Sequence, residues 1–382
     1  MKKNDDHSGR SSFDQLRRIV VKIGSSILEK NREQTIRKIA RQIKSLQSRS
    51  CEIVLVTSGA IFFGVNKLQR TTAPVTLPQK QATAAVGQPL LMSFYQNVFS
   101  EQEINTAQVL LTQDGIHNHQ TYLNACNTMN TLLDMDVLPI VNENDTVATE
   151  EIQFGNNDNL ASLVTIMVDA DLLVILSDVA GLYKDGPRSG EDPISKVPQI
   201  DENIRKMARP SDQDRTTVGG MITKIEAAET VTKSGIPMVI ADGNQQNVLT
   251  RILKGESIGT FFQANEHSPL RGRKRWISHH LPVKGSVWVD RGAADALVNR
   301  GKSLLPSGVS DVNGQFERGD AIDIVNPAGQ HFARGLSNYS REEIESLRGC
   351  QTGEISDILG YHNFDEIIHR DNLVIDPHDE TN

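Results

Sequence analysis

The sequence predicts an α/β protein, with a mostly parallel β-sheet sandwiched by helices and a small C-terminal β-rich domain. Short β-branched runs, such as 17–23 and 51–56, alternate with longer segments of helical periodicity. Several of these runs are apolar on both faces, which is typical of parallel strands buried between two layers of helices. After about residue 281 the pattern changes to short strands separated by their own turns.

The predicted strands and helices follow one another in order along the chain. The strand at 17–23 ends in Gly24-Ser25-Ser26 and precedes a helix over about 34–46, and the strand at 51–56 ends in Thr57-Ser58-Gly59. Further strands are predicted at 104–111, 137–141, 172–176 and 236–240, and further helices at 79–99, 120–133, 159–169 and 219–233. In the C-terminal part we predict strands at 285–289, 321–325 and 373–375 and helices at 293–298 and 341–347.

The length of 382 residues is long for one hydrophobic core and predicts two domains. We expect a disordered lead-in at 1–15, the large α/β domain at 16–265, a linker at 266–281 and the small domain at 282–376. The lead-in has two lysines but no apolar stretch, so it is no secretory signal peptide. No apolar run approaches the ~20 residues that a membrane-spanning helix requires.

The cysteines, histidines and charged residues indicate which ligands and which cellular compartment to expect. The three cysteines are far apart and outside any metal-ligand spacing, and His117 and His119 lack a third ligand nearby, so we expect no metal site and a cytoplasmic protein. Residues 281–382 hold nine Lys and Arg against 17 Asp and Glu, which accounts for the whole net charge of −8. RNA is therefore an improbable partner for this domain, because phosphate contacts supply most nucleic-acid affinity.

Polar side chains follow four of the predicted strands at the point where each strand ends. These clusters are Lys22 to Ser26, Thr57-Ser58-Gly59, Asn142 to Asp145, and Ser177-Asp178. In an open parallel sheet, ligands bind beyond the carboxyl ends of the strands. The sequence therefore predicts a site for a phosphate compound and a polar metabolite at this edge of the sheet.

The stretch from 138 to 163 is the most polar part of this predicted site. Eight amide or carboxylate side chains fall within 18 positions: Asn142, Glu143, Asn144, Asp145, Asn156, Asn157, Asp158 and Asn159. Such groups are costly to bury unless they bind a ligand or one another. Taken alone, the stretch is explained at least as well by two Asx-rich turns, and the neighbouring clusters are what favour a binding site.

Three further candidates each have a structural alternative. Lys22 is either a strand-end lysine at the surface or a point charge beside backbone N–H groups that face an anion, without the spacing of a Walker loop. Ser58 is equally consistent with a helix N-cap and with binding of a substrate carboxylate. Gly219-Gly220 opens a helix in which Lys224 lies one turn in; this is either a glycine-rich helix start with a solvated lysine or a site where the lysine reaches a transferred phosphoryl group.

Eight segments carry a family resemblance: VVKIGSS, VTSGAI, AAVGQPLLM, LLTQDG, LPIVNENDTVATEEIQFGNNDNLASLV, LLVILSDVAGLYKDGPR, VGGMITKIEAA and RGRKRWI. In this order they resemble the glutamate 5-kinases (gamma-glutamyl kinases) of the amino acid kinase family, and the C-terminal domain resembles the PUA domain appended to many of these kinases. The resemblance covers about residues 16 to 375. It implies ATP-dependent phosphorylation of the glutamate γ-carboxylate to glutamyl 5-phosphate, the first step of proline biosynthesis.

The resemblance also implies residue roles. Lys22 and Lys224 match the lysines that stabilise charge on the ATP phosphates and the transferred group, and Asp158 matches the aspartate that holds both lysines. The glutamate-binding residues of the family match Ser58, Asp145 and Asn157. The nucleotide-binding residues match Lys22, Ser177, Asp178, Val218, Gly219, Gly220, Met221, Ile222, Thr223 and Lys224.

Ligands and partners follow from the same resemblance. Mg²⁺ would bridge the ATP oxygens with few protein ligands. The acceptor carboxylate is already ionised at neutral pH, so no strong general base is needed. We also expect a homo-oligomer (dimer or tetramer), feedback inhibition by proline, and hand-over of the product to glutamate-5-semialdehyde dehydrogenase.

Two places depart from the family pattern. Asn156 stands where Asp is common, which removes one negative charge from the expected amino-acid pocket, and Thr217-Val218 stands where Gly-Thr is common. These departures motivate one alternative, a sensor of proline or glutamate that has no catalytic turnover. The retention of both lysines and of Asp158 argues against this alternative. A second alternative is an RNA-binding protein that acts through the PUA-like domain, against which the acidic charge speaks.

Overall fold

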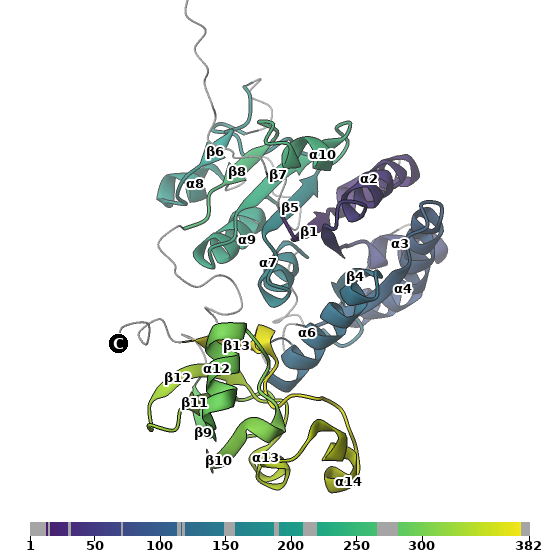
Figure 1. Ribbon diagram of the computed structural model, residues 1–382. Helices are drawn as coiled ribbons and strands as arrows, with labels where there is room; N and C mark the ends of the chain where they lie inside the picture. Colours follow the sequence, from purple (N-terminus) through teal and green to yellow (C-terminus); the bar gives the residue numbers. More distant parts are fainter. Residues whose placement is uncertain are drawn as a thin grey trace, which may run out of the picture. The chain divides into compact units, whose positions relative to one another are not determined.

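The computed structural model describes residues 13, 16–29, 32–69, 72–112, 116, 119–148, 157–186, 191–208, 220–265 and 282–375. The chain forms two compact units, one of Met1–Gly115 with Thr128–Gly272 and the other of Ile116–Asn127 with Arg273–Asn382 (Figure 1). The predicted linker at 266–281 lies outside the described residues. Within the predicted lead-in, Phe13 donates a backbone hydrogen bond to Leu253 O at 2.9 Å.

The large unit is built on a sheet whose described strands are ordered β3-β4-β2-β1-β5-β7-β8-β6. All neighbours pair in parallel except β7 and β8, which are antiparallel. The strands are β1 (Arg18–Ile23), β2 (Glu52–Val56), β3 (Thr106–Leu111), β4 (Leu138–Glu143), β5 (Leu172–Ser177), β6 (Lys196–Val197), β7 (Met238–Asp242) and β8 (Thr260–Phe262). Strands β1, β4 and β5 are buried along their whole length, as expected for a parallel sheet between two layers of helices, and the predicted α/β class is confirmed.

Helices cover both faces of this sheet. The helices described before the C-terminal domain are α1 (Ser25–Glu29), α2 (Arg32–Gln47), α3 (Ala60–Lys67), α4 (Leu77–Ser100), α6 (His119–Asp134), α7 (Asn157–Met167), α8 (Glu202–Met207), α9 (Met221–Lys233) and α10 (Val248–Leu253). One hydrophobic cluster joins α2, α4 and α10 to Ile19, Val21 and Ile23 of β1. Because side chains alternate along a strand, Lys22 points to the opposite face, where α7 and α9 pack together (Figure 1).

Helices α3 and α4 approach each other closely because glycines line their contact. A Cβ atom added at Gly87 would lie 1.7 Å from the carbonyl oxygen of Ala60, and one added at Gly64 would lie 2.0 Å from that of Thr83. No side chain larger than hydrogen fits at either position without a shift of the backbone. Since Ala60 is the first residue of α3, this packing fixes the start of that helix next to the end of β2.

The C-terminal domain has its own sheet and its own core. Its described strands are ordered β10-β9-β11-β12-β13, with only β9 and β11 paired in parallel. The strands are β9 (Val283–Val289), β10 (Val309–Gly314), β11 (Ala321–Val325), β12 (His331–Leu336) and β13 (Leu373–Ile375), and the α-helices are α12 (Arg291–Arg300), α13 (Arg341–Leu347) and α14 (Ile355–Leu359). A separate hydrophobic cluster that includes Val287, Ile322 and Ile344 fills this domain. No helix in the described part of either unit is both long and apolar enough to cross a membrane.

Candidate active site

Three charged side chains meet at the carboxyl end of the central strands in the large unit. Lys22 is the fifth residue of β1, Asp158 is the second residue of α7, and Lys224 lies in the first turn of α9. Lys22 Nζ is 2.6 Å from Asp158 Oδ1, and Lys224 Nζ is 3.2 Å from Asp158 Oδ2. The structure therefore brings together the three residues for which sequence analysis predicts a catalytic role.

This cluster is nearly inaccessible to solvent and holds two ammonium groups around one carboxylate. The exposed fractions of Lys22, Asp158 and Lys224 are 2%, 0% and 7%. Burial lowers the pKa of Lys22, against the attraction of Asp158, and the charge of Lys224 lowers it further. Burial alone would raise the pKa of Asp158, but the two lysines and hydrogen bonds from Lys22 and Thr223 outweigh it and hold the pKa below its ordinary value. A buried excess of positive charge favours an anionic ligand.

Thr223 connects the carboxylate to the start of α9. Its Oγ1 lies 2.9 Å from Asp158 Oδ2 and 3.0 Å from the carbonyl oxygen of Gly220. A hydroxyl group has one hydrogen, so it donates to one of these two acceptors at a time. Asp158 Oδ2 therefore contacts two consecutive residues in the first turn of α9, Thr223 and Lys224.

A second set of polar contacts ties α7 to the ends of β2 and β4. Asn157 Nδ2 donates to the carbonyl oxygen of Thr57 and, at 2.7 Å, to Asn142 Oδ1. Asn142 Nδ2 in turn donates to Gln88 Oε1 of α4 at 2.7 Å, and the hydroxyl of Thr57 is 2.7 Å from that of Tyr95. Sequence analysis singled out Asn157 and Asn142 but missed Gln88 and Tyr95. Nothing in the sequence links these two residues to the site; their hydrogen bonds in the structure do.

Ser58 and Asp145, predicted to bind the substrate, follow β2 and β4 and are both half-buried. The N-cap of α3 is Gly59, with a φ of 108° and no side-chain cap, so the N-cap explanation of Ser58 is wrong. Burial raises the pKa of Asp145 to about 6. A carboxylate that is costly to ionise in the free protein gains from a cationic ligand such as an ammonium group.

The predicted nucleotide-binding residues lie partly within the described chain. Ser177, at the end of β5, is buried, and its Oγ lies 3.2 Å from Asp178 Oδ1. Among the described residues, a Cβ atom added at Gly220 would meet no atom within 4 Å. Met221 and Ile222 are half-buried in the first turn of α9. The other positions of interest, Val218, Gly219, Thr217, Asn156 and His117, lie outside the described residues.

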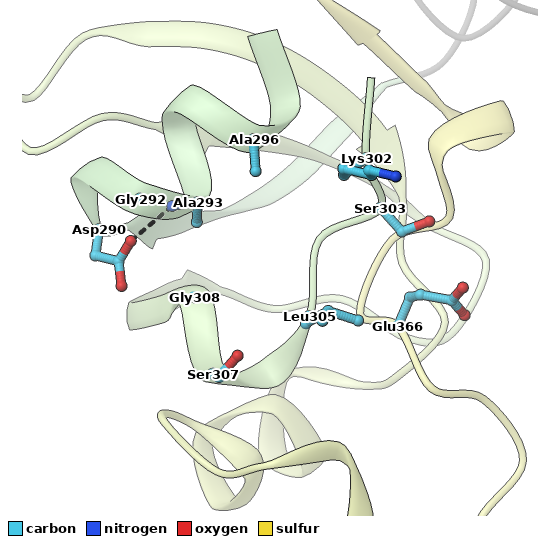
Figure 2. A pocket seen from close by; sticks show the side chains of 10 residues that line it. All are labelled: Asp290, Gly292, Ala293, Ala296, Lys302, Ser303, Leu305, Ser307, Gly308 and Glu366. Carbon is cyan, nitrogen blue, oxygen red and sulfur yellow. Dashed lines mark hydrogen bonds between the residues drawn. The ribbon is translucent and has the colours of Figure 1, made fainter. Parts of the chain in front are cut away.

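The C-terminal domain contains a separate open cavity of about 500 Å³ (Figure 2). Figure 2 shows small residues of α12, Ala293 and Ala296, on one side and Leu305 and Ser307 on the other. None of the predicted site residues lines it. Over the described ranges, no group of three or more His, Cys, Asp or Glu residues is placed to hold a metal ion.

Comparisons with protein families place both parts of the chain. The amino acid kinase family matches residues 17–242, and the PUA domain matches residues 285–359. A carbamate kinase from Giardia lamblia bound to AMP-PNP superposes with a TM-score of 0.47 at 17% identity, covering 66% of this chain and 100% of that one. The two family matches define the class of protein, an amino acid kinase domain followed by a PUA domain.

Curated relatives narrow the class to one branch. Glutamate 5-kinase from Caldanaerobacter subterraneus subsp. tengcongensis is 48% identical over 364 residues, which is 94% of this chain and 97% of the relative. Glutamate 5-kinase from Moorella thermoacetica is 45% identical over 372 residues, or 96% and 98% of the two chains. The chain therefore belongs to the glutamate 5-kinases of the amino acid kinase family.

Proposed function

We propose that this protein transfers the γ-phosphoryl group of ATP to the γ-carboxylate of glutamate, giving glutamyl 5-phosphate, the first intermediate of proline biosynthesis from glutamate. The observation that carries the proposal is the buried Asp158 carboxylate, which holds Lys22 and Lys224 at the carboxyl ends of the central strands. The relatives that carry the name glutamate 5-kinase match over nearly the whole chain and support the same activity.

Phosphoryl transfer needs positioning and charge neutralisation more than covalent participation by the protein. Lys22 and Lys224 each present an ammonium group held by Asp158, and the cluster keeps a net positive charge inside a buried site. Fixed charges of this kind stabilise the negative charge that spreads over the phosphoryl oxygens in the transition state. The attacking γ-carboxylate is ionised at neutral pH, so no side chain has to remove a proton.

The two substrates are proposed to occupy opposite halves of the sheet. Glutamate would lie over the β2 and β4 ends, bound by Ser58, Asp145 and Asn157, with Asp145 facing its ammonium group. ATP would lie over the β5 and β7 side, where Ser177, Asp178, Gly220, Met221, Ile222 and Thr223 are the described residues proposed to bind it, together with Val218 and Gly219. The central strand β1 would then place Lys22 between the two substrates.

We propose that Mg²⁺ enters with ATP, whose phosphate oxygens would supply most of its ligands. Both oxygens of Asp158 are already within 3.2 Å of a lysine Nζ, so this carboxylate suits the role of holding the lysines. When bound, the ion would neutralise phosphate charge beside the two ammonium groups. A homo-oligomer, inhibition by proline and hand-over of the product to glutamate-5-semialdehyde dehydrogenase are further parts of the proposal.

The decisive experiment offers the protein ATP, Mg²⁺ and hydroxylamine with glutamate, aspartate or N-acetylglutamate in separate reactions. Hydroxylamine traps an acyl phosphate as a hydroxamate, and we expect the product with glutamate alone. Asp158→Asn is the matched variant, because it keeps the shape of the side chain and removes the charge that holds both lysines. Release of ADP without hydroxamate from any of the three acids would refute the proposed function.

A further inference from the structure

A buried threonine of β8 is hydrogen-bonded to the segment that leaves β5. Thr260 has an exposed fraction of 0%, and its Oγ1 accepts a hydrogen bond of 2.8 Å from the backbone N–H of Leu182, whose exposed fraction is 1%. Pairing with Ile240 of β7 uses only the backbone of Thr260. Burying a hydroxyl group is costly unless the group is hydrogen-bonded. The hydroxyl of Thr260 accepts a hydrogen bond from Leu182, and a valine at this position could not.

The same segment is held closely on a second side. A Cβ atom added at Gly181 would lie 2.5 Å from Thr260 Oγ1 and 3.0 Å from Pro193 Cβ, so only glycine fits against the threonine without a shift. The carbonyl oxygen of Leu182 accepts a hydrogen bond of 2.7 Å from the N–H of Ile194. Residues 181 and 182 are therefore clamped between β8 and the segment around Ile194.

Leu182 lies five residues beyond Ser177, the last residue of β5. The other end of the segment is fixed by the sheet, because β5 pairs with β1 and the N–H of Gly24 donates to Leu176 O at 3.0 Å. Five residues span at most ~17 Å, so anchoring Leu182 restricts the whole turn that starts with Ser177 and Asp178. Thr260 can thus act on that turn without touching a substrate.

We propose that Thr260 is a positioning residue for the nucleotide: its hydroxyl, through Leu182, holds the Ser177–Leu182 turn in the conformation that binds ATP. This inference rests on the proposed placement of ATP beyond β5. It predicts an effect confined to one substrate, since the glutamate-binding residues lie on the β2 and β4 side of the sheet and share no bond with Thr260.

The test compares Thr260→Val, which removes the hydroxyl and keeps the branched shape, with Thr260→Ser, which keeps the hydroxyl. The dissociation constant of Mg²⁺-ATP is measured by calorimetry without glutamate, and KM is measured for both substrates. Thr260→Val should weaken ATP binding about tenfold, the order expected when a buried N–H loses its acceptor, and leave the KM for glutamate within about twofold. Thr260→Ser should bind ATP like the unaltered protein.

Thr165→Val is the matched control, because Thr165 is also fully buried but its hydroxyl donates to Ala161 O within α7. If Thr260→Val does not fold, Gly181→Ala perturbs the same contact from the other partner and should weaken ATP selectively. An ATP dissociation constant within twofold of the original in the folded variant, equal losses for both substrates, or a serine variant as weak as the valine variant would each overturn the inference. ATP binding without hydroxamate formation in the unaltered protein would instead count against the proposed function.

Discussion

At the scale of single residues, Asp158 organises the site. Its two oxygens hold two lysines that come from β1 and α9, 202 positions apart in the sequence, and each lysine is kept near the other despite their mutual repulsion. Removing the carboxylate would take away the negative charge that holds two buried ammonium groups close together, which destabilises the site by more than the loss of one hydrogen bond. Removing one lysine instead leaves a neutral pair and isolates the role of the missing charge.

The first prediction concerns Lys224. Lys224→Ala should lower kcat by about 10²- to 10³-fold, the effect typical of losing one preorganised charge or donor at the transition state, and change the KM for glutamate much less. Steady-state hydroxamate formation measures both. Lys233→Ala is the control, since Lys233 lies at the end of the same helix with a side chain 70% exposed and paired with Glu229. An unchanged kcat in Lys224→Ala would exclude the catalytic role.

The second prediction concerns the pH dependence of glutamate binding. In the free protein burial raises the pKa of Asp145 to about 6, so the carboxylate that would bind the substrate ammonium group is lost below that pH. We expect kcat/KM for glutamate to fall about tenfold per unit below pH 6, because the γ-carboxylate of glutamate itself stays ionised to about pH 4.3. Asp145→Asn should bind glutamate more weakly and lack this acidic limb.

The same pKa shift has a consequence for stability, and its sign is opposite to that of a salt-bridged aspartate. The folded pKa lies above the ordinary value of 3.8, so the folded protein binds this proton more tightly than the unfolded chain does. Stability is therefore lost as pH rises from about 4 to about 6. Without ligand, Asp145→Asn should have a higher Tm than the unaltered protein at pH 7.5 and the same Tm near pH 4; a lower Tm at pH 7.5 would contradict the assignment.

At the scale of helices and strands, the order of elements could be predicted from the sequence because alternating apolar periodicity is a local signal. The buried runs of β1, β4 and β5 are examples. The partners within the site are not local: Asn142 and Gln88 are 54 positions apart, and Thr260 and Leu182 are 78. Such pairs depend on register and packing, which no single stretch of sequence contains.

Short or turn-rich strands were also missed for a physical reason. β6 and β8 have two and three residues, too few to show a period of two. Asn313-Gly314 has the composition of a turn, but the structure places both residues at the end of β10, with Gly314 at a φ of 97°. At Asn313 and Gly314, pairing with β9 overrides the turn propensity of the sequence.

The third prediction concerns the contact between α3 and α4. Gly87→Ala would place a Cβ atom 1.7 Å from Ala60 O, so the helices must separate, and we expect a loss of about 1–3 kcal/mol in the free energy of unfolding. Denaturant unfolding followed by circular dichroism measures it. Ala85→Ser, on the exposed side of α4, is the control and should change stability little. Equal unfolding midpoints for the two variants would show that the helices are not closely packed at this position.

At the scale of the whole molecule, charge and hydrophobic cores are divided between two units. Each unit has its own hydrophobic cluster, and the net negative charge belongs to residues 281–382. A PUA domain match alone would suggest contact with RNA, whereas the charge of this domain opposes it. The family match predicts that the domain binds RNA, and its negative charge predicts that it does not; a binding experiment distinguishes the two.

The fourth prediction is therefore that the full-length protein does not bind structured RNA tightly at low salt. Electrostatic attraction is strongest at low ionic strength, so about 50 mM salt gives RNA binding its best chance. Filter binding with a basic RNA-binding domain as positive control measures it. Retention of RNA at submicromolar protein that disappears as salt is raised would show that a local basic patch outweighs the overall charge.

If Lys22 and Lys224 act as proposed, the position of β1 in the middle of the large sheet also determines when the protein becomes active during its own synthesis. This first strand pairs with β2 soon after it is made, but its other neighbour, β5, is translated about 150 residues later, and α9 later still. A nascent chain that has not yet been translated as far as Lys224 contains Lys22 but lacks the second lysine of the site. Such sequence-distant pairing slows folding, and under the proposed mechanism it restricts phosphoryl transfer to chains whose kinase domain has been translated almost to its end.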